Sequence, residues 1–249
     1  MTADVLQAAD LCKAFGSLQV TDHVSLRLPQ GRRHGLIGPH GAGKTTLFNL
    51  ITGEVAADAG LVYVGGRDVS GTPPDVRARA GLARSFQRNN LFGDLTVREN
   101  LELACALKHR IGHVFWRPAR RFADLREEAE ANAERLGLAE HLPVPVSTLP
   151  YGTQRHLEIG LALVREPMVL LLDEPTAGMS PAETGGIVDL LASLPGSLTL
   201  LIVEHDMDVI FELAERITVL DYGRVLLEGT PDEVRGSAEV RSRYLGVRD

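Results

Sequence analysis

The chain has 249 residues, 44% of them apolar, and a formal net charge of −7, which suits one large or two small globular domains and argues against a general nucleic-acid binder. Its cysteines, Cys12 and Cys105, stand in no metal-ligand or C-x-x-C spacing, so we expect free thiols in a reducing compartment. No apolar run approaches the roughly 18 residues of a membrane span, and Met1 to Asp10 carries no secretion signal, which predicts a cytosolic or membrane-peripheral protein.

The first predicted elements are two strands, residues 5–11 and 20–28, joined by a turn at Gly16 and Ser17. Phe15 lies at this turn. Two roles stay open for it, a loop-packing aromatic and a platform for a nucleotide base, because one aromatic residue carries little specificity.

The next segment matches the phosphate-binding P-loop pattern G-x-x-x-x-G-K-[ST], between an apolar strand-like run and a helical run. Its glycines let backbone N–H groups approach a polyphosphate at the N-terminus of the helix. Lys44 supplies a positive charge for the β- and γ-phosphates, and the Thr45 hydroxyl supplies a ligand for Mg²⁺. The predicted phosphate-binding residues are Gly38, His40, Gly41, Ala42, Gly43, Lys44, Thr45 and Thr46.

Beyond the P-loop helix, residues 60–69 predict a strand and a Gly-Gly turn, and residues 81–86 predict a strand that ends at Gln87. Ligand groups in α/β sheets lie at the carboxyl ends of strands. Gln87 is therefore a candidate to ligate Mg²⁺, position water and sense the γ-phosphate, with a solvated glutamine as the alternative.

Residues 97–107 and about 122–138 show helical periodicity, as do residues 153–164 after a proline-rich stretch. Between the first two helices, residues 108–121 combine basic side chains with Val114, Phe115 and Trp116. This insert can face anionic headgroups or a partner protein, or it can be a solvated connection with one buried tryptophan.

Two buried strands end in charged residues. Residues 168–172 are followed by Asp173 and Glu174, and residues 198–203 by Glu204 and His205. Carboxylates at such a place are costly unless a cation compensates them, and Mg²⁺ at the P-loop would do so. We therefore expect Asp173 to orient the metal through its water and Glu174 to act as general base. A structural salt bridge is the alternative.

His205 is a candidate to contact the γ-phosphate and hold the attacking water, with a structural histidine as the alternative. Residues 217–220 and 225–227 predict a closing hairpin, and residues 232–244 predict a polar helix.

In this order, the motifs resemble those of the ATP-binding subunits of ABC transporters along essentially the whole chain. Residues 38–46 match Walker A, Gln87 the Q-loop, residues 170–174 Walker B and His205 the switch histidine, while residues 149–155 (LPYGTQR) stand where the LSGGQ signature belongs.

The resemblance implies an α/β fold: a P-loop NTPase (RecA-like) core with an antiparallel β subdomain and a helical subdomain, the ABC ATPase architecture. It further implies one ABC ATPase domain over 1–249, with the helical subdomain inserted at about 90–160 and a helical tail at 232–249. It also implies that Phe15 stacks on adenine.

Within this family, the chain is most similar to the branched-chain amino acid importer ATPases. That likeness rests on LFGDLTVREN (91–100), the insert near Trp116, LEIGLAL (157–163), EPTAGMSPAE (174–183), the segment 202–224 and the closing Tyr244-Leu245-Gly246.

The resemblance implies ATP and Mg²⁺ as cofactors and two subunits facing head to tail, either identical or paralogous, with each ATP between one P-loop and the other subunit's Gly152 region. It also implies transmembrane permease partners, no nucleic acid, and a peripheral location at the cytoplasmic face of the inner (plasma) membrane. Leu91 and Phe92 are expected to form an exposed pair that receives a permease helix.

Other functions stay open. One is an ABC ATPase subunit for the transport of another small solute such as urea, and the other is a regulatory or assembly ABC protein. Regulatory and assembly ABC proteins often carry two fused cassettes, whereas this chain has one. A GTPase switch is poorly supported, because no N-K-x-D motif occurs.

The sequence departs from the family at two motifs. Pro150 replaces the signature serine, and the D-loop, Ala177-Gly178-Met179-Ser180, lacks the usual aspartate. Gly152 and the helix N-terminus after it can still present N–H groups to phosphate, so we expect turnover to be retained at a lower rate.

Overall fold

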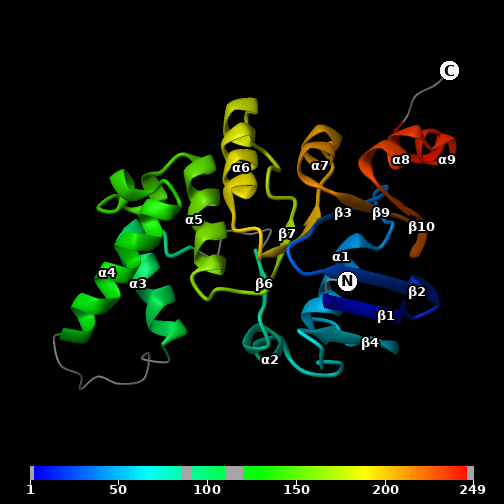
Figure 1. Ribbon diagram of the computed structural model, residues 1–249, viewed down its shortest axis with the longest axis horizontal. Helices are drawn as coiled ribbons and strands as arrows, with labels where there is room; N and C mark the ends of the chain where they lie inside the picture. Colours follow the sequence, from blue (N-terminus) through cyan, green and yellow to red (C-terminus); the bar gives the residue numbers. More distant parts are fainter. Residues whose placement is uncertain (1–2, 86–90, 110–119, 246–249) are drawn as a thin grey trace. The chain divides into compact units, whose positions relative to one another are not determined.

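The computed structural model describes residues 3–85, 91–109 and 120–245. The chain divides into two compact units (Figure 1). The first comprises Met1–Arg84, Pro167–Pro175 and Leu194–Asp249, and the second comprises Ser85–Glu166 and Thr176–Ser193. Each unit is described by itself.

The first unit contains a six-stranded sheet in the order β10-β9-β3-β8-β7-β6. The neighbouring pairs run parallel, except that β10 is antiparallel to β9. All five residues of both β7 and β8 are buried, as expected for central strands of a parallel sheet covered on both faces. The strands are β3 (Arg33–Ile37), β6 (Leu82–Arg84), β7 (Val169–Asp173), β8 (Thr199–Val203), β9 (Arg216–Asp221) and β10 (Arg224–Gly229).

The same unit contains a second sheet in the order β2-β1-β4-β5, with antiparallel pairing throughout. Phe15 pairs with Leu18 across the predicted turn at residues 16 and 17, which confirms the first hairpin. One apolar core joins this sheet to helix α1 (Lys44–Thr52) and to strands of the parallel sheet. The strands are β1 (Asp4–Phe15), β2 (Leu18–Pro29), β4 (Ala59–Val64) and β5 (Arg67–Asp68).

Helix α2 (Pro74–Arg79) fixes the end of α1. Its Arg77 is buried and donates from Nη1 to the carbonyls of Leu50 and Ile51, both at 2.7 Å. Carbonyls in the last turn of a helix lack partners within the helix. Arg77 therefore caps α1, the helix that begins at the P-loop.

The C-terminal part of the first unit contains α7 (Met207–Leu213) and three short helices, α8 (Pro231–Gly236), α9 (Ala238–Val240) and η3 (Arg241–Leu245). The sequence predicted one polar helix over 232–244. The helix is interrupted because Ser237 has an extended backbone and its side chain caps α9 by accepting a hydrogen bond from the N–H of Val240.

The second unit is helical. Helix α3 (Val97–Lys108) begins at Thr96, which forms a capping box with Glu99. It packs on α4 (Arg120–Arg135) and on α5 (Tyr151–Leu163), and α5 packs on α6 (Pro181–Ser193). Two short helical turns, η1 (Ala139–His141) and η2 (Val146–Thr148), connect α4 to α5.

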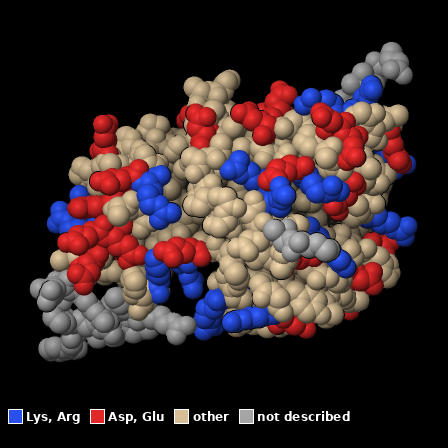
Figure 2. Space-filling model, in the orientation of Figure 1, with Lys and Arg blue, Asp and Glu red and all other residues tan. Residues whose placement is uncertain are grey.

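Among the residues described, no helix has the length and apolar character that crossing a membrane requires. On the face shown in Figure 2, acidic and basic side chains are interspersed.

Candidate functional site

Three loops of the first unit meet at one edge of the parallel sheet. The P-loop follows β3, Glu174 follows β7 and His205 comes soon after β8. Strand β8 pairs with β3 on one side and β7 on the other, with Val203 opposite both Leu36 and Asp173. The carboxyl ends of these strands are therefore level, which is where α/β sheets place ligand sites.

The P-loop needs glycine at two positions for steric reasons. Gly38 has φ 152°, and a Cβ there would lie 2.2 Å from the Leu220 carbonyl oxygen; Gly43 has φ 100°, and a Cβ there would lie 2.5 Å from the Val20 carbonyl oxygen. Gly43 is also the N-cap of α1 and makes no side-chain cap hydrogen bond. Because Gly43 has no side chain, it leaves the backbone N–H groups in the first turn of α1 open to an anion.

Lys44 lies at the start of α1 and is buried. Its Nζ donates to the carbonyl oxygens of Gly38 at 2.7 Å and Pro39 at 3.0 Å. Burial lowers the pKa of Lys44, and the carboxylates of Glu174 and Asp173 oppose this shift. The ammonium group is thus largely removed from water and held inside the loop that the sequence assigned to phosphate.

Asp173 ends β7 and is 1% exposed. Its Oδ2 accepts a hydrogen bond from Arg84 Nη2 at 2.8 Å, and the other end of this guanidinium, Nη1, contacts Asn49 Oδ1 at 2.6 Å and Glu54 Oε2 at 3.1 Å. The sequence predicted that Mg²⁺ would compensate this carboxylate. In the structure, Arg84 forms a salt bridge with Oδ2 of Asp173, which was the alternative to a metal site. The role of Asp173 in binding the metal stays a prediction.

Glu174 and His205, both predicted to act on the attacking water, are in contact. Glu174 Oε1 lies 2.8 Å from His205 Nε2, and the rings of His205 and His40 are 4.7 Å apart between centroids. Glu174 has φ 47°, in the left-handed region that non-glycine residues rarely adopt. Its N–H donates to the Val203 carbonyl at 2.9 Å, which fixes this turn against β8.

These groups surround a cavity of about 200 Å³. The residues that line it are Val20, His40, Gly41, Ala42, Gly43, Lys44, Thr45, Thr46, Glu174 and His205. Phe15 is not among them; its side chain is 51% exposed and Lys13 Nζ lies 5.5 Å from its ring centroid. Gln87 lies outside the described residues. The structure thus brings together most of the predicted phosphate site with Glu174 and His205.

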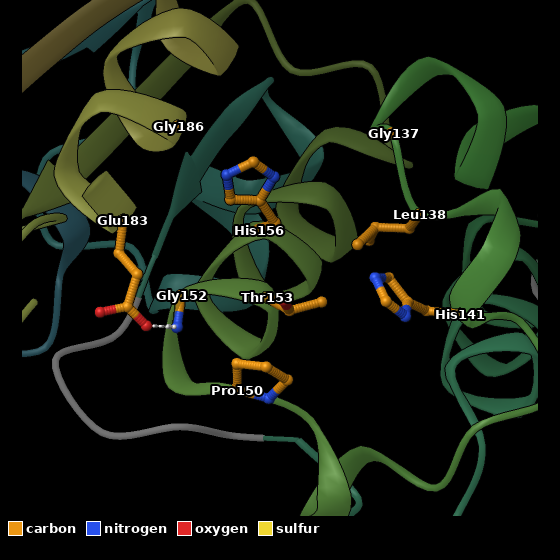
Figure 3. A pocket seen from close by; sticks show the side chains of 9 residues that line it. All are labelled: Gly137, Leu138, His141, Pro150, Gly152, Thr153, His156, Glu183 and Gly186. Atoms are coloured by element: carbon orange, nitrogen blue, oxygen red, sulfur yellow. Dashed lines mark hydrogen bonds between the residues drawn. The ribbon is translucent and has the colours of Figure 1, made fainter. Parts of the chain in front are cut away.

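Gly152 belongs to the second unit, in the first turn of α5 after Pro150. Its N–H donates to Glu183 Oε1 at 3.0 Å (Figure 3). Pro150, Gly152, Thr153 and Glu183 line a cavity of about 230 Å³ within this unit. The N–H that the resemblance assigned to phosphate is therefore bonded to a carboxylate of its own chain.

Leu91 and Phe92 were expected to be exposed, and this expectation holds for one of them; their role in binding a permease stays a prediction. Phe92 is 60% exposed, whereas Leu91 is half-buried. Most of the basic-aromatic insert, including Trp116, lies outside the described residues. Of its described part, Lys108 and His109 both contact Glu128, at 2.9 Å and 2.7 Å.

Sequence reasoning missed three contacts. Arg84 reaches Asp173 because β6 pairs with β7, a pairing that no local pattern reveals. Glu183 stands three residues after Ser180, and this S-x-x-E pattern signals a capping box. Tyr244 makes a hydrogen bond with the backbone of Gly38, while burial raises the pKa of its phenol. This last contact joins the C-terminal tail to the P-loop.

The chain is similar to known ATP-binding proteins over most of its length. The family model for "ABC transporter" matches residues 21–177. The chain is 39% identical over 253 residues, and 99% of both chains, to the high-affinity branched-chain amino acid transport ATP-binding protein LivG of Salmonella typhimurium.

Two solved structures are also similar. One is the ADP conformation of MJ1267, an ATP-binding cassette of an ABC transporter, with TM-score 0.86, 29% identity, and 99% of this chain and 100% of that one covered. The other is the dimeric post-hydrolysis state of the cassette MJ0796 bound to ADP and Pi, with TM-score 0.76, 25% identity, and 91% and 98% covered. The predicted fold class is confirmed, and the chain belongs to the ABC transporter family as an ATP-binding subunit that hydrolyses ATP.

Proposed function

We propose that this chain hydrolyses Mg²⁺-bound ATP at the P-loop cavity, with Glu174 as general base and His205 as the residue that positions it. The observation that carries this proposal is the 2.8 Å contact between Glu174 Oε1 and His205 Nε2 at the wall of that cavity. A general base must lie within hydrogen-bond reach of the proton that it accepts, and its orientation must be fixed. His205 supplies such an orienting contact.

The chain's own residues account for binding and proton transfer. Backbone N–H groups at the start of α1 and the Lys44 ammonium hold the triphosphate. Glu174 accepts a proton as water attacks the γ-phosphorus, and the bond from that phosphorus to the bridging oxygen breaks to release ADP. His205, beside Glu174 and the ring of His40, keeps the carboxylate aimed at the water.

The donor set at this edge of the sheet fits Mg²⁺. Thr45 offers a hydroxyl and Asp173 a carboxylate, and Mg²⁺ prefers such oxygen ligands together with water and phosphate oxygens. Arg84 engages Oδ2 of Asp173, which orients the carboxylate. When bound, the ion neutralises charge that develops on the phosphate oxygens. Gln87 stays a predicted further ligand.

Two cassettes complete each site in this proposal. The second unit serves as the helical subdomain predicted for about residues 90–160, and its Gly152 region meets the ATP held by the P-loop of another subunit. Support comes from the dimeric state named for the similar cassette MJ0796 and from the presence of a signature segment and a P-loop in one chain. The neighbour is a second copy or a paralogue.

The transported solutes in this proposal are branched-chain or other hydrophobic amino acids, and support comes from the similar protein LivG, which is named for high-affinity branched-chain amino acid transport. The chain would then bind transmembrane permease subunits at the cytoplasmic face of the inner membrane, with Phe92 among the residues that contact them. Co-purification with a polytopic membrane protein, followed by amino acid uptake in reconstituted vesicles, tests this assignment.

Glu174→Gln tests the catalytic role. The variant should bind ATP as tightly as the wild type, while phosphate release falls by about 10²- to 10⁴-fold, the usual contribution of a general base. Glu212→Gln removes the same charge at an exposed position of α7 in the same unit and should leave phosphate release unchanged. Wild-type turnover by Glu174→Gln would remove Glu174 from its proposed role.

A further inference from the structure

A single carboxylate joins the starts of two helices in the second unit. Glu183 Oε1 accepts the Gly152 N–H at 3.0 Å, in the first turn of α5. Its Oε2 accepts the N–H of Ser180 at 3.0 Å and the Ser180 hydroxyl at 2.7 Å, just before α6 begins. Figure 3 shows the Glu183 side chain reaching from α6 to Gly152.

The contact places a full negative charge at the start of α5. Hydrogen bonds from the Ser180 hydroxyl and N–H and from the Gly152 N–H hold the pKa of Glu183 below its usual value. The carboxylate is therefore ionised at neutral pH. It uses an N–H group at a helix N-terminus in the way that a phosphate oxygen would.

Because residue 150 is a proline, the Gly152 N–H is a more important hydrogen-bond donor at the start of α5. Proline is the N-cap of α5 and makes no side-chain cap hydrogen bond, and it has neither a hydroxyl nor a backbone N–H to offer. Gly152 and Glu183 both line the cavity of about 230 Å³ in this unit, so a ligand can reach the bond between them.

We propose that Glu183 is an internal competitor for the Gly152 N–H, which it releases when the γ-phosphate of ATP on a neighbouring cassette takes its place. This inference rests on the proposed pairing of two cassettes. The carboxylate and the phosphate carry like charges and cannot share one donor at close range. Glu183 must therefore turn away, while its Oε2 contacts link that movement to Ser180 in the D-loop.

The proposal predicts that removing the charge of Glu183 favours pairing. The experiment uses the full chain with Glu174→Gln, so that ATP is bound but not consumed, and measures dimer formation against Mg²⁺-ATP concentration by analytical ultracentrifugation. Adding Glu183→Gln should lower the ATP concentration for half-maximal dimer by about three- to tenfold, since a neutral amide holds the N–H less strongly. Glu127→Gln, an exposed site on α4, is the matched control and should cause no shift.

Glu183→Ala provides a second variant, and its thermal unfolding shows whether the helical unit remains folded. If Glu183 only caps the helix, ATP-dependent dimer formation should be weaker or unchanged in both variants. That result would overturn the competitor role. If the Glu174→Gln parent binds ATP yet never pairs, in the presence or absence of a paralogue, the pairing itself is wrong and the competitor role falls with it.

Discussion

His34 should make the folded chain sensitive to acid. It lies on β3, next to the P-loop, and is 2% exposed. Its Nε2 lies 2.8 Å from the Thr218 hydroxyl oxygen on β9. Burial first, and the charge of Arg216 second, lower the pKa of His34 from 6.5 to about 4.

The expected loss of stability follows from the difference between the ordinary pKa of His34, 6.5, and its pKa in the folded chain, about 4. Between pH 6.5 and about 4 the unfolded chain binds a proton at His34 that the folded chain does not. Stability therefore falls as the pH decreases through this window, and His34 contributes no change above it. At about 1.4 kcal/mol for each pH unit, the loss is about 3 kcal/mol.

Equilibrium urea unfolding of the wild type and His34→Gln, repeated from pH 7.5 down to 4, measures this loss. Glutamine retains an amide that can bond Thr218 but does not titrate. The difference between the two free energies of unfolding should be constant above pH 6.5. Between pH 6.5 and 4, the wild type should lose about 3 kcal/mol of stability relative to His34→Gln. Parallel curves down to pH 4 would refute the reasoning, because they would mean that His34 titrates alike in both states.

Three further substitutions test the nucleotide site through ATP affinity, measured by fluorescence titration. Lys44→Met should weaken ATP binding by about 10- to 100-fold, the loss of a charged hydrogen bond, and unchanged binding would contradict its role. Tyr244→Phe should weaken binding by about two- to tenfold because the contact with Gly38 is lost, whereas Tyr222→Phe, at an 87% exposed position, should not. Phe15→Ala should cost about 1–3 kcal/mol of ATP affinity if the ring stacks on adenine, with tripolyphosphate binding unaffected; an equal loss for both ligands would argue against stacking.

The sequence was sufficient for features that depend on local patterns. The P-loop is recognisable because its glycines meet steric demands at fixed spacing, and β7 is recognisable because a continuous apolar run ends in Asp173. The sequence assigned both Glu174 and His205 to the attacking water because each comes after a buried strand, and the structure shows that the level ends of β7 and β8 bring their side chains together.

Contacts between segments that are distant in the sequence could not be predicted from local sequence patterns. The Arg84 contact with Asp173 requires β6 to be the neighbour of β7. The bond between Glu183 and Gly152 joins residues 31 positions apart on two helices, and the sequence contained only the local capping pattern at Ser180. The break in the predicted tail helix depends on the backbone of Ser237.

The backbone of Glu174 has a consequence for how this protein can change over generations. A left-handed conformation favours glycine over any branched or long side chain, so replacing Glu174 by glycine would relieve backbone strain while removing the proposed general base. Under the proposed role, stability and turnover therefore place opposing demands on this residue.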